Sequence, residues 1–466
     1  MMKKVSKLLL ILLTICLILS IFAGCGKKSD SGTAAGGGQK VTIRVAIPGA
    51  EERDVLIPEY DGRIKGTRDS AALINRKMPD INFEFVHTPN QDWVLNMEAT
   101  ITAGLTDIAL YTNQTNAGEM YFDNDELFAM DNSISKADLY GKFTDAAMWY
   151  TNFKSLQHPG QSGYRGLPIA VYYFPFGYDK QLFDDWGVPY PSETPTYAEL
   201  LDKARRTSGR NPKTGQMNFG ASIGTSFNEF MMIGWDAIKP LSLNPMDIGN
   251  MQPSDYNYFG SSPEVLEYFR WIAAIVDLCP PGIPTGAGAE RWFTEENDIV
   301  INLRMNNNSI FQRTWISDRK DLHERFIPIN MPTGPKGGWS QTPMDIHLAV
   351  CRNTPHPVEA WQVLKTICTD KEIVDNISMA GFLFDNVPAL KDVSGMKVME
   401  MPQVKLGHAN RAPTAFLTDD YWFWRQPGIS TLGNMYTKAI TPEQARTEFQ
   451  TKIDEWISSV KLRLGK

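Results

Sequence analysis

Strand-like and helix-like patterns alternate between residues 41 and 113. Runs of β-branched and aromatic residues that read as buried strands occupy Val41–Ile47, Ile81–Pro89 and Thr106–Asn113. Apolar residues at helical spacing occupy Ala71–Lys77 and Trp93–Ala103 between them. A β-α-β-α-β order predicts a parallel sheet with helices on its faces, so this part of the chain is predicted to be α/β.

A second alternation follows residue 178. Helical patterns occupy Lys180–Gly187, Thr196–Arg206 and Pro263–Leu278, and strand patterns occupy Met217–Gly224 and Asp298–Met305. The remaining predicted elements are strands at Arg325–Pro332 and Ile346–Cys351 and helices at Pro357–Thr369 and Thr441–Leu462. Because the roughly 425 residues that follow residue 40 are too many for one core of ordinary size, we expect two domains.

Two loops are the first candidates for a binding site. In open α/β sheets, ligands bind beyond the carboxyl ends of the strands. The loops that follow the first and third predicted strands are Pro48–Arg53 and Tyr111–Asn116. We therefore expect ligand contacts in these two segments.

The N-terminus has the order of an export signal. Three lysines within the first seven residues precede an apolar run from Leu8 to Phe22, which is shorter than the roughly 20 residues that span a bilayer. A cleaved signal of residues 1–24 is our prediction, and a one-pass anchor is the alternative. Residues 26–40, which are rich in Gly, Ser, Lys and Ala, predict a flexible tether.

Charge and histidine usage exclude some classes of partner. Removal of residues 1–24 takes three lysines and no acid from a chain of formal net charge −7, which leaves −10. A mildly acidic surface argues against nucleic acid or anionic lipid as the main partner. The six histidines are scattered and form no HExxH motif, so we expect no metal site and no cofactor.

The cysteines predict no disulfide scaffold. After cleavage the chain keeps Cys25, Cys279, Cys351 and Cys368, without any CxxC pair. Cys351 ends a predicted strand and Cys368 lies on the following helix, so a bridge between them stays open. Separate buried thiols are the favoured interpretation.

Motifs for catalysis are weak. Gly220–Gly224 spells G-x-S-x-G after a predicted strand, as in a hydrolase nucleophile elbow, but no HGGG-like oxyanion loop accompanies it. A glycosidase needs two facing carboxylates, and nothing in the sequence pairs Glu51, Glu52 or Glu193. The phosphate loop GxxxxGK[ST] is absent, so the chain does not supply its own ATPase. We therefore expect no enzyme.

Residues 22–25, Phe-Ala-Gly-Cys, resemble the lipobox of bacterial lipoproteins, in which the cysteine becomes the lipid-modified first residue. Phe22 departs from the usual Leu. The resemblance implies a soluble body held by lipid on Cys25 at the extracellular face of the cell membrane. An ordinary signal with a chance cysteine is the alternative.

The stretch Tyr164–Val188, YRGLPIAVYYFPFGYDKQLFDDWGV, resembles a signature of bacterial extracellular solute-binding protein family 1, the sugar-binding kind. Its P-I-A-V run matches maltodextrin-binding proteins, and Asp179 replaces the usual Asn. The other motifs that recur in the family in the same order are Thr196–Leu200, Gly334–Gly338, Leu348–Ile367 and Ala380–Leu390. The resemblance therefore covers nearly the whole chain after the tether.

This resemblance implies a two-lobed periplasmic-binding-protein-like α/β fold of type II, with discontinuous lobes joined by crossing strands. Lobe 1 would comprise residues 41–172 and 326–372, and lobe 2 residues 173–325 and 373–466. The crossings would lie near Leu167–Tyr178, Arg325–Ile329 and Asp370–Asn376. The ligand would bind between the lobes, where closure excludes water.

The resemblance also nominates binding residues. Sugars offer hydroxyl edges and apolar faces, so their sites combine planar polar groups with aromatic rings. Tyr172 stands where maltodextrin-binding proteins carry a ligand-binding Glu, and Tyr111 stands at their stacking Trp. The complete set of ligand-binding candidates is Tyr172, Tyr173, Tyr111, Asn113, Gln114, Glu51, Arg53, Asn228, Trp235, Trp339, Asp345 and Trp422. For each of them, a place in the core or on a solvated surface is the alternative.

The function implied is that of a lipid-anchored extracellular receptor. It would capture a carbohydrate, expected to be an oligosaccharide, and deliver it to the membrane permease subunits of an ABC importer. We expect it to act as a monomer. The alternatives are a receptor for a different solute, such as a peptide or a modified sugar acid, and a surface glycan hydrolase or adhesin.

Overall fold

The structure is a computed structural model, and it describes most of the chain after the tether. The described residues are 40–58, 62–89, 91–111, 120–145, 147–148, 152–153, 163–172, 176–224, 233–234, 258–282, 291–304, 319–334, 345–379, 386–409, 430–463 and 465. The chain divides into residues 1–40 and a compact unit, residues 41–466.

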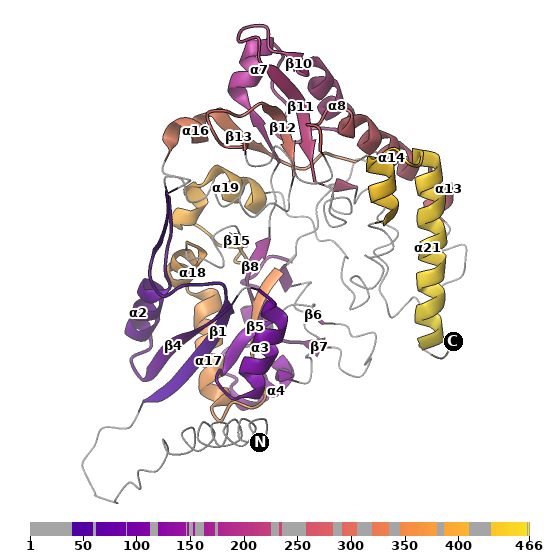
Figure 1. Ribbon diagram of the computed structural model, residues 1–466. Helices are drawn as coiled ribbons and strands as arrows, with labels where there is room; N and C mark the ends of the chain where they lie inside the picture. The colour runs from indigo at the N-terminus through magenta and orange to yellow at the C-terminus, as the bar shows by residue number, and fades with distance from the viewer. Residues whose placement is uncertain are drawn as a thin grey trace, which may run out of the picture. The chain divides into compact units, whose positions relative to one another are not determined.

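Six strands form the first sheet, in the order β15-β8-β14-β5-β1-β4 (Figure 1). Their bounds are β1 Val41–Pro48, β4 Ile81–Thr88, β5 Ile108–Tyr111, β8 Leu167–Tyr172, β14 Asp345–Val350 and β15 Asn386–Pro388. Strand β1 pairs in parallel with both β4 and β5. This confirms the parallel sheet predicted from the first alternation.

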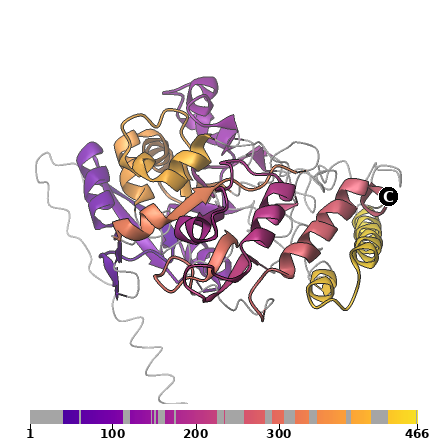
Figure 2. The ribbon, with the colours of Figure 1, turned by 90° about the horizontal axis from the view of Figure 1, so that it is seen from above.

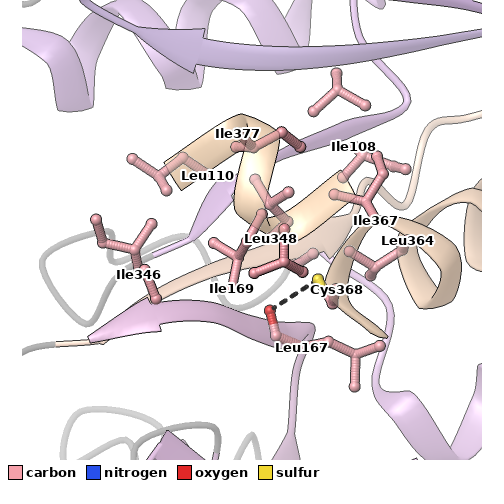
Figure 3. Packing of buried hydrophobic residues seen from close by; sticks show 14 of the residues in the cluster. Ile108, Leu110, Leu167, Ile169, Ile346, Leu348, Leu364, Ile367, Cys368 and Ile377 are labelled. Carbon is pink, nitrogen blue, oxygen red and sulfur yellow. Dashed lines mark hydrogen bonds between the residues drawn. The ribbon is translucent and has the colours of Figure 1, made fainter. Parts of the chain in front are cut away.

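Helices and strands of this group share one hydrophobic core. The helices are α2 Arg68–Lys77, α3 Trp93–Thr102, α4 Asn124–Met130, α5 Lys136–Tyr140, α17 Pro357–Thr369, α18 Lys371–Ser378 and α19 Pro402–Ala409, with the short helix η6 Lys397–Glu400. Figure 3 shows Ile108, Ile169 and Leu348, from three neighbouring strands, gathered beside Leu364 and Ile367 of α17. Burial of these apolar side chains is what holds the helices on the sheet.

Five strands form the second sheet, in the order β10-β11-β12-β9-β13. Their bounds are β9 Phe176–Asp179, β10 Gly209–Arg210, β11 Met217–Ile223, β12 Ile299–Leu303 and β13 Phe326–Ile329. Strands β11 and β12 are parallel, and β9 is antiparallel to both β12 and β13. The helices of this group are α7 Lys180–Trp186, α8 Tyr197–Arg206, α13 Tyr258–Ser261, α14 Pro263–Val276, α16 Lys320–Arg325 and α21 Pro442–Arg463.

The second sheet and its helices share a separate hydrophobic core. Buried aromatic residues of α14, Tyr268 and Phe269, pack there with Phe449 of α21. Helices α14 and α21 lie in contact, as the salmon and yellow ribbons in Figures 1 and 2 indicate. Each of the two large sheets thus has its own buried cluster.

Helix starts follow local sequence signals. The hydroxyl of Ser262 accepts a hydrogen bond from the Val265 N–H at 3.3 Å, and Pro263 takes the first turn of α14. The hydroxyl of Thr196 accepts a hydrogen bond from the Glu199 N–H at 3.1 Å and begins α8. These caps explain why the helices predicted over these segments form with nearly the predicted bounds.

Two short antiparallel pairs complete the described strands. Strands β2 Val55–Ile57 and β3 Gly62–Ile64 pair with each other after β1. Strands β6 Asn152–Phe153 and β7 Gly163–Tyr164 form the other pair. Neither pair was predicted, because runs of two or three residues carry no readable periodicity.

The expectation that lobe 1 resumes at residue 326 is wrong for β13. Phe326–Ile329 pairs antiparallel with β9 in the second sheet. The ring of Phe326 also lies 4.8 Å from that of Trp292, within a small buried cluster of its own. The chain returns to the first sheet between β13 and β14, not within Arg325–Ile329.

The expectation that residues 373–466 all belong to lobe 2 also needs correction. Ile373, Val374 and Ile377 of α18 are buried in the first core, and so are residues of β15 and α19. The Ser70 hydroxyl donates to the Asn376 side chain at 2.7 Å and ties α18 to α2. No crossing therefore lies at Asp370–Asn376, and the chain reaches the second core only after α19. The predicted crossing over Leu167–Tyr178 is confirmed, because β8 and β9 belong to different sheets.

The cysteine question is resolved in favour of thiols. Cys279, Cys351 and Cys368 are free and buried. The Cys368 thiol donates to the Leu167 carbonyl at 3.8 Å, the dashed line in Figure 3. Burial raises the pKa of all three thiols, that of Cys279 to about 12. They are therefore protonated and unreactive at neutral pH.

Candidate functional site

Strand directions bring several candidate residues to one edge of the first sheet. Strand β14 lies between β5 and β8 and runs antiparallel to both. The carboxyl ends of β5 and β8, at Tyr111 and Tyr172, therefore meet the start of β14 at Asp345. The register agrees, since His347 pairs with Tyr111 and Asp345 pairs with Val171. The pairing of these strands therefore places three of the predicted residues, Tyr111, Tyr172 and Asp345, at neighbouring positions of the backbone.

The end of β1 lies at the same edge. In the parallel pair of β1 and β5, Val45 is level with Ile108 and Ala46 with Ala109. Two residues further along, the end of β1 at Pro48 is level with the end of β5 at Tyr111. The loop after β1, which includes Glu51 and Arg53, therefore leaves the sheet beside β5. This is the edge at which α/β sheets bind ligands.

The loop after β1 is held by backbone contacts. The carbonyl of Glu51 accepts hydrogen bonds from the N–H of Thr67 at 3.0 Å and from its hydroxyl at 3.3 Å. The N–H of Arg68 donates to the Glu52 carbonyl at 3.1 Å. Because these bonds restrain the backbone, the exposed side chains of Glu51 and Arg53 are presented from a fixed position.

Gly66 makes this close approach possible. A Cβ atom on Gly66 would lie 2.4 Å from both the Arg53 carbonyl carbon and the Glu52 oxygen, closer than real Cβ atoms approach backbone. The N–H of Gly66 also donates to the Asp54 carboxylate at 2.9 Å. Only glycine fits there without moving the loop.

His87, near the end of β4, joins the same loop. Its Nε2 lies 2.9 Å from the Thr67 hydroxyl, which itself donates to Glu51. Desolvation lowers the pKa of His87 below its usual value, while the charges of Glu51 and Glu52 oppose this shift. The ring is therefore mainly neutral at pH 7, where it can donate or accept a hydrogen bond but adds no positive charge.

The second sheet has a comparable edge. Strands β11 and β12 end in parallel at Ile223 and Leu303, and Gly224 and Arg304 follow them. The N–H of Arg304 donates to the Asn302 side chain at 3.2 Å. Sequence reasoning did not nominate Arg304. A cation after a strand is ordinarily solvated, so the sequence carries no signal that singles out Arg304.

Several sequence-predicted residues lie outside the described part of the chain. They are Cys25, Asn113, Gln114, Tyr173, Asn228, Trp235, Trp339 and Trp422. For Tyr111, Tyr172 and Asp345 the structure describes the backbone but not the side chains. The lipid on Cys25 and the ligand contacts of the other residues stay predictions.

The G-x-S-x-G motif does not form a nucleophile elbow. Ser222 is fully buried within β11, where it is level with Asn302 of β12. An elbow needs the serine on a sharp turn between a strand and a helix, with its hydroxyl exposed. The Ser222 hydroxyl has no hydrogen-bond partner and no exposure, so a substrate would not reach it.

Among the described residues, no group of three His, Cys, Asp or Glu side chains could hold a metal ion. Within the same residues, every helix is either too short or too polar to cross a membrane.

Comparison with known proteins places the fold. No protein-family model matches the sequence, and no curated protein sequence matches it. Among solved structures, the sugar-binding protein MalE from Xanthomonas citri matches with a TM-score of 0.62 at 13% identity, over 91% of this chain and 100% of that one. Cyclic alpha-maltosyl-1,6-maltose binding protein from Arthrobacter globiformis matches with a TM-score of 0.61 at 14% identity, over 90% and 100%.

A third match is an ABC substrate-binding protein from Listeria monocytogenes in complex with cycloalternan. Its TM-score is 0.58 at 13% identity, over 90% of this chain and 99% of that one. At such identities the likeness is one of fold, and it extends over nearly the whole of each chain. The structure is therefore a mixed α/β protein with the fold of carbohydrate-binding substrate-binding proteins.

Proposed function

We propose that this chain is the substrate-binding receptor of an ABC importer and that its ligand is a carbohydrate, specifically an oligosaccharide. The observation that carries the proposal is the fold likeness over about 90% of the chain to proteins described as sugar-binding or bound to sugar. The receptor acts as a monomer that captures ligand and presents it to the permease subunits. Binding shifts the receptor to a closed state because only that state contacts the ligand from both lobes.

The edge of the first sheet supports a carbohydrate ligand in particular. Strands β5 and β8 end at Tyr111 and Tyr172, and β14 begins at Asp345. Tyrosine rings can pack against the apolar face of a sugar, while a carboxylate accepts hydrogen bonds from its hydroxyls. Glu51 and Arg53, on the neighbouring loop, add further groups for hydroxyl recognition.

The anchoring of the receptor forms a separate part of the proposal. Lipid on Cys25, after removal of residues 1–24, retains the protein at the extracellular face of the cell membrane. The tether of residues 26–40 then gives the compact unit enough reach to meet its permease. The support here is the order of charged, apolar and small residues before Cys25.

Isothermal titration calorimetry with purified residues 41–466 tests the function. The titrants are a panel of neutral and acidic oligosaccharides of two to six units, with short peptides as the non-sugar arm. Saturable binding of at least one saccharide is the expected result. Absence of saccharide binding at millimolar concentration, or preference for a peptide, would overturn the carbohydrate assignment.

Product analysis of the same mixtures tests the enzyme alternative. A receptor leaves every oligosaccharide intact after prolonged incubation. Release of shorter sugars, abolished in the variant Ser222→Ala, would instead identify a hydrolase. The burial of Ser222 leads us to expect no such release.

A further inference from the structure

Arg304 stands at the carboxyl end of β12, at the edge of the second sheet. It follows the strand Ile299–Leu303, in which every residue is buried and all but Asn302 are apolar. Asn302 and Arg304 are two residues apart and therefore point to the same side of the sheet. The Asn302 side chain accepts the Arg304 backbone N–H at 3.2 Å, which fixes the direction of the chain as it leaves the strand.

The guanidinium of Arg304 is buried in part without a partner. Its Nε and Nη1 atoms are inaccessible to water and make no hydrogen bond. Three other described arginines, Arg165, Arg291 and Arg446, also have a buried Nε without a hydrogen bond, but each interacts with another group. The charge of Arg165 acts on Glu126. Arg291 pairs with Asp298 at 2.8 Å, and Arg446 donates to the Ser262 carbonyl at 3.1 Å.

No described acid balances the charge of Arg304. Its neighbour Cys279 is a neutral thiol: burial raises the pKa of Cys279 to about 12, and the nearby positive charge of Arg304 only partly opposes that shift. Asp277, which also acts on Cys279, is half-exposed and pairs with Lys438 at 2.5 Å. The second sheet therefore holds a positive charge, at the carboxyl end of β12, that the described residues leave uncompensated.

A guanidinium withdrawn from water without a counter-charge is costly, since both its solvation and its hydrogen bonds are lost. Such a group is stabilised when a bound anion supplies the charge and the acceptors. Arginine suits this role because its planar fork forms two parallel hydrogen bonds with a carboxylate and keeps its charge at any physiological pH.

We propose that Arg304 binds an oxyanion carried by the ligand, so that this receptor takes an acidic saccharide, such as an oligomer of uronic acid. The inference rests on the proposed carbohydrate-binding function and names the class of sugar. Arg304 supplies the charge from the second sheet. The groups at the edge of the first sheet then recognise hydroxyls and ring faces.

Calorimetry with a matched pair of probes tests this inference. The probes are trigalacturonate and the same trisaccharide with its carboxyl groups reduced to neutral alcohols. We expect the wild type to bind trigalacturonate more tightly than the reduced form. In Arg304→Gln this preference should fall by about 10–100-fold, the range expected for the loss of a charge-assisted hydrogen bond. Arg304→Lys keeps the charge without the fork and should retain part of the preference.

A sulfated disaccharide forms the second arm, because sulfate offers the same oxyanion chemistry as carboxylate. If the wild type prefers the sulfated disaccharide to trigalacturonate and Arg304→Gln loses this preference, Arg304 is an anion site and the anion of the ligand is a sulfate. Arg291→Gln is the matched control, because Arg291 has its own acid partner, and it should leave the preference unchanged. Equal binding of neutral and acidic probes by the wild type, unaffected by Arg304→Gln, would overturn the inference while leaving the proposed function intact.

Thermal unfolding without ligand gives an independent readout. If Arg304 lacks a partner within the protein, Arg304→Met removes an uncompensated charge and should melt at the same temperature as the wild type or higher. A clear fall in melting temperature would mean that the protein itself satisfies Arg304, and the inference would fail. If neither probe binds while another neutral saccharide of the panel does, this inference fails and the proposed function stands. If no saccharide of the panel binds, both fail.

Discussion

The carboxylate of Asp179 and the guanidinium of Arg325 form a fork-to-fork ion pair inside the second sheet group. Arg325 Nε donates to both Asp179 oxygens at 2.9 Å, and its Nη2 donates to Oδ2 at 2.6 Å. The Asp179 side chain is fully buried. It also accepts the Leu182 N–H at the start of α7 and the Asn297 amide before β12. One carboxylate thus joins β9, α7, β12 and the end of α16.

The first prediction follows from the burial of this pair. Arg325→Met leaves the Asp179 carboxylate buried with amide donors only, so the free energy of unfolding should fall by about 3–5 kcal/mol. Chemical denaturation followed by circular dichroism measures it. Arg319→Met is the control, since Arg319 forms comparable ion pairs with Asp321 and Glu295 at the surface. That variant should unfold at nearly the wild-type denaturant concentration, and an equal loss in both variants would refute the argument.

The same pair explains why the sheet membership of β13 was not predictable. Phe326–Ile329 reads FIPI, a short apolar run that fits a buried strand in either sheet. Its partner strand ends at Asp179, 146 residues earlier than Arg325. Local pattern identifies such a strand, but the choice of sheet depends on a contact between distant residues, and the sequence offers no periodicity for it.

In the candidate site, too, some residues were predictable from the sequence and others were not. Tyr111, Tyr172 and Asp345 could be located from sequence because strand ends follow from local patterns and the family resemblance. Arg304 could not, because a cation after an apolar strand is ordinarily solvated. Arg304 lies near Cys279, which approaches it only in the folded chain. The sequence therefore allows the ends of strands to be predicted, but it does not allow the burial of a single polar side chain to be predicted.

The second prediction concerns acid stability. Burial alone would raise the pKa of Asp131, but hydrogen bonds from Lys365 and Ser133 outweigh it and hold that pKa at about 2. Because the folded value lies below the unfolded one, the stabilisation is complete above pH 4 and is lost as the pH falls toward 2. Lys365→Met should lower the free energy of unfolding at pH 7 by about 2 kcal/mol and flatten its dependence on pH below 4.

Unfolding free energies at several pH values between 2 and 7 give the comparison. Lys391→Met is the control, since Lys391 pairs with Asp145 at 3.1 Å but both side chains are largely exposed. It should cost less than about 1 kcal/mol at pH 7 and keep the wild-type pH profile. A Lys365→Met profile that stays as steep as the wild type would show that Asp131 is not the group responsible.

The third prediction concerns the loop after β1. In Gly66→Ala the new methyl group meets the Glu52 and Arg53 backbone at 2.4 Å, so the loop must move. Strain of this kind costs about 1–3 kcal/mol. If Glu51 and Arg53 contact ligand, the affinity measured by calorimetry should fall as well.

Gly433→Ala makes the same chemical change in a helix where the methyl group meets nothing within 4 Å. It should raise the free energy of unfolding by up to about 1 kcal/mol, because alanine favours helix more than glycine does. Gly66→Ala with wild-type stability would mean that the loop yields easily, and its backbone contacts would then not be what positions Glu51 and Arg53.

The fourth prediction concerns the tyrosines at the ends of β5 and β8. Replacing Tyr111 or Tyr172 by alanine removes an aromatic surface, and the affinity for a bound saccharide should fall roughly 3–10-fold for each. Phenylalanine at either position keeps the ring and should retain most of the affinity if stacking dominates. Tyr190→Ala serves as a control, since Tyr190 stacks on Tyr178 at the second sheet and should affect stability rather than binding. Unchanged affinity in both alanine variants would remove these residues from the site.

The last prediction concerns anchoring. Lipid on Cys25 is the only attachment that the proposal invokes, so Cys25→Ala should move the protein from the membrane fraction to the medium or leave a precursor with residues 1–24 uncleaved. Cell fractionation with immunoblotting distinguishes these products by location and mass. Cys279→Ala removes a buried thiol that is protonated at neutral pH, so its partition should match the wild type. If Cys25→Ala is processed normally and still sediments with membranes after a high-salt wash, the attachment does not depend on lipid at this residue. The apolar run Leu8–Phe22 or a protein partner would then have to hold the receptor in place.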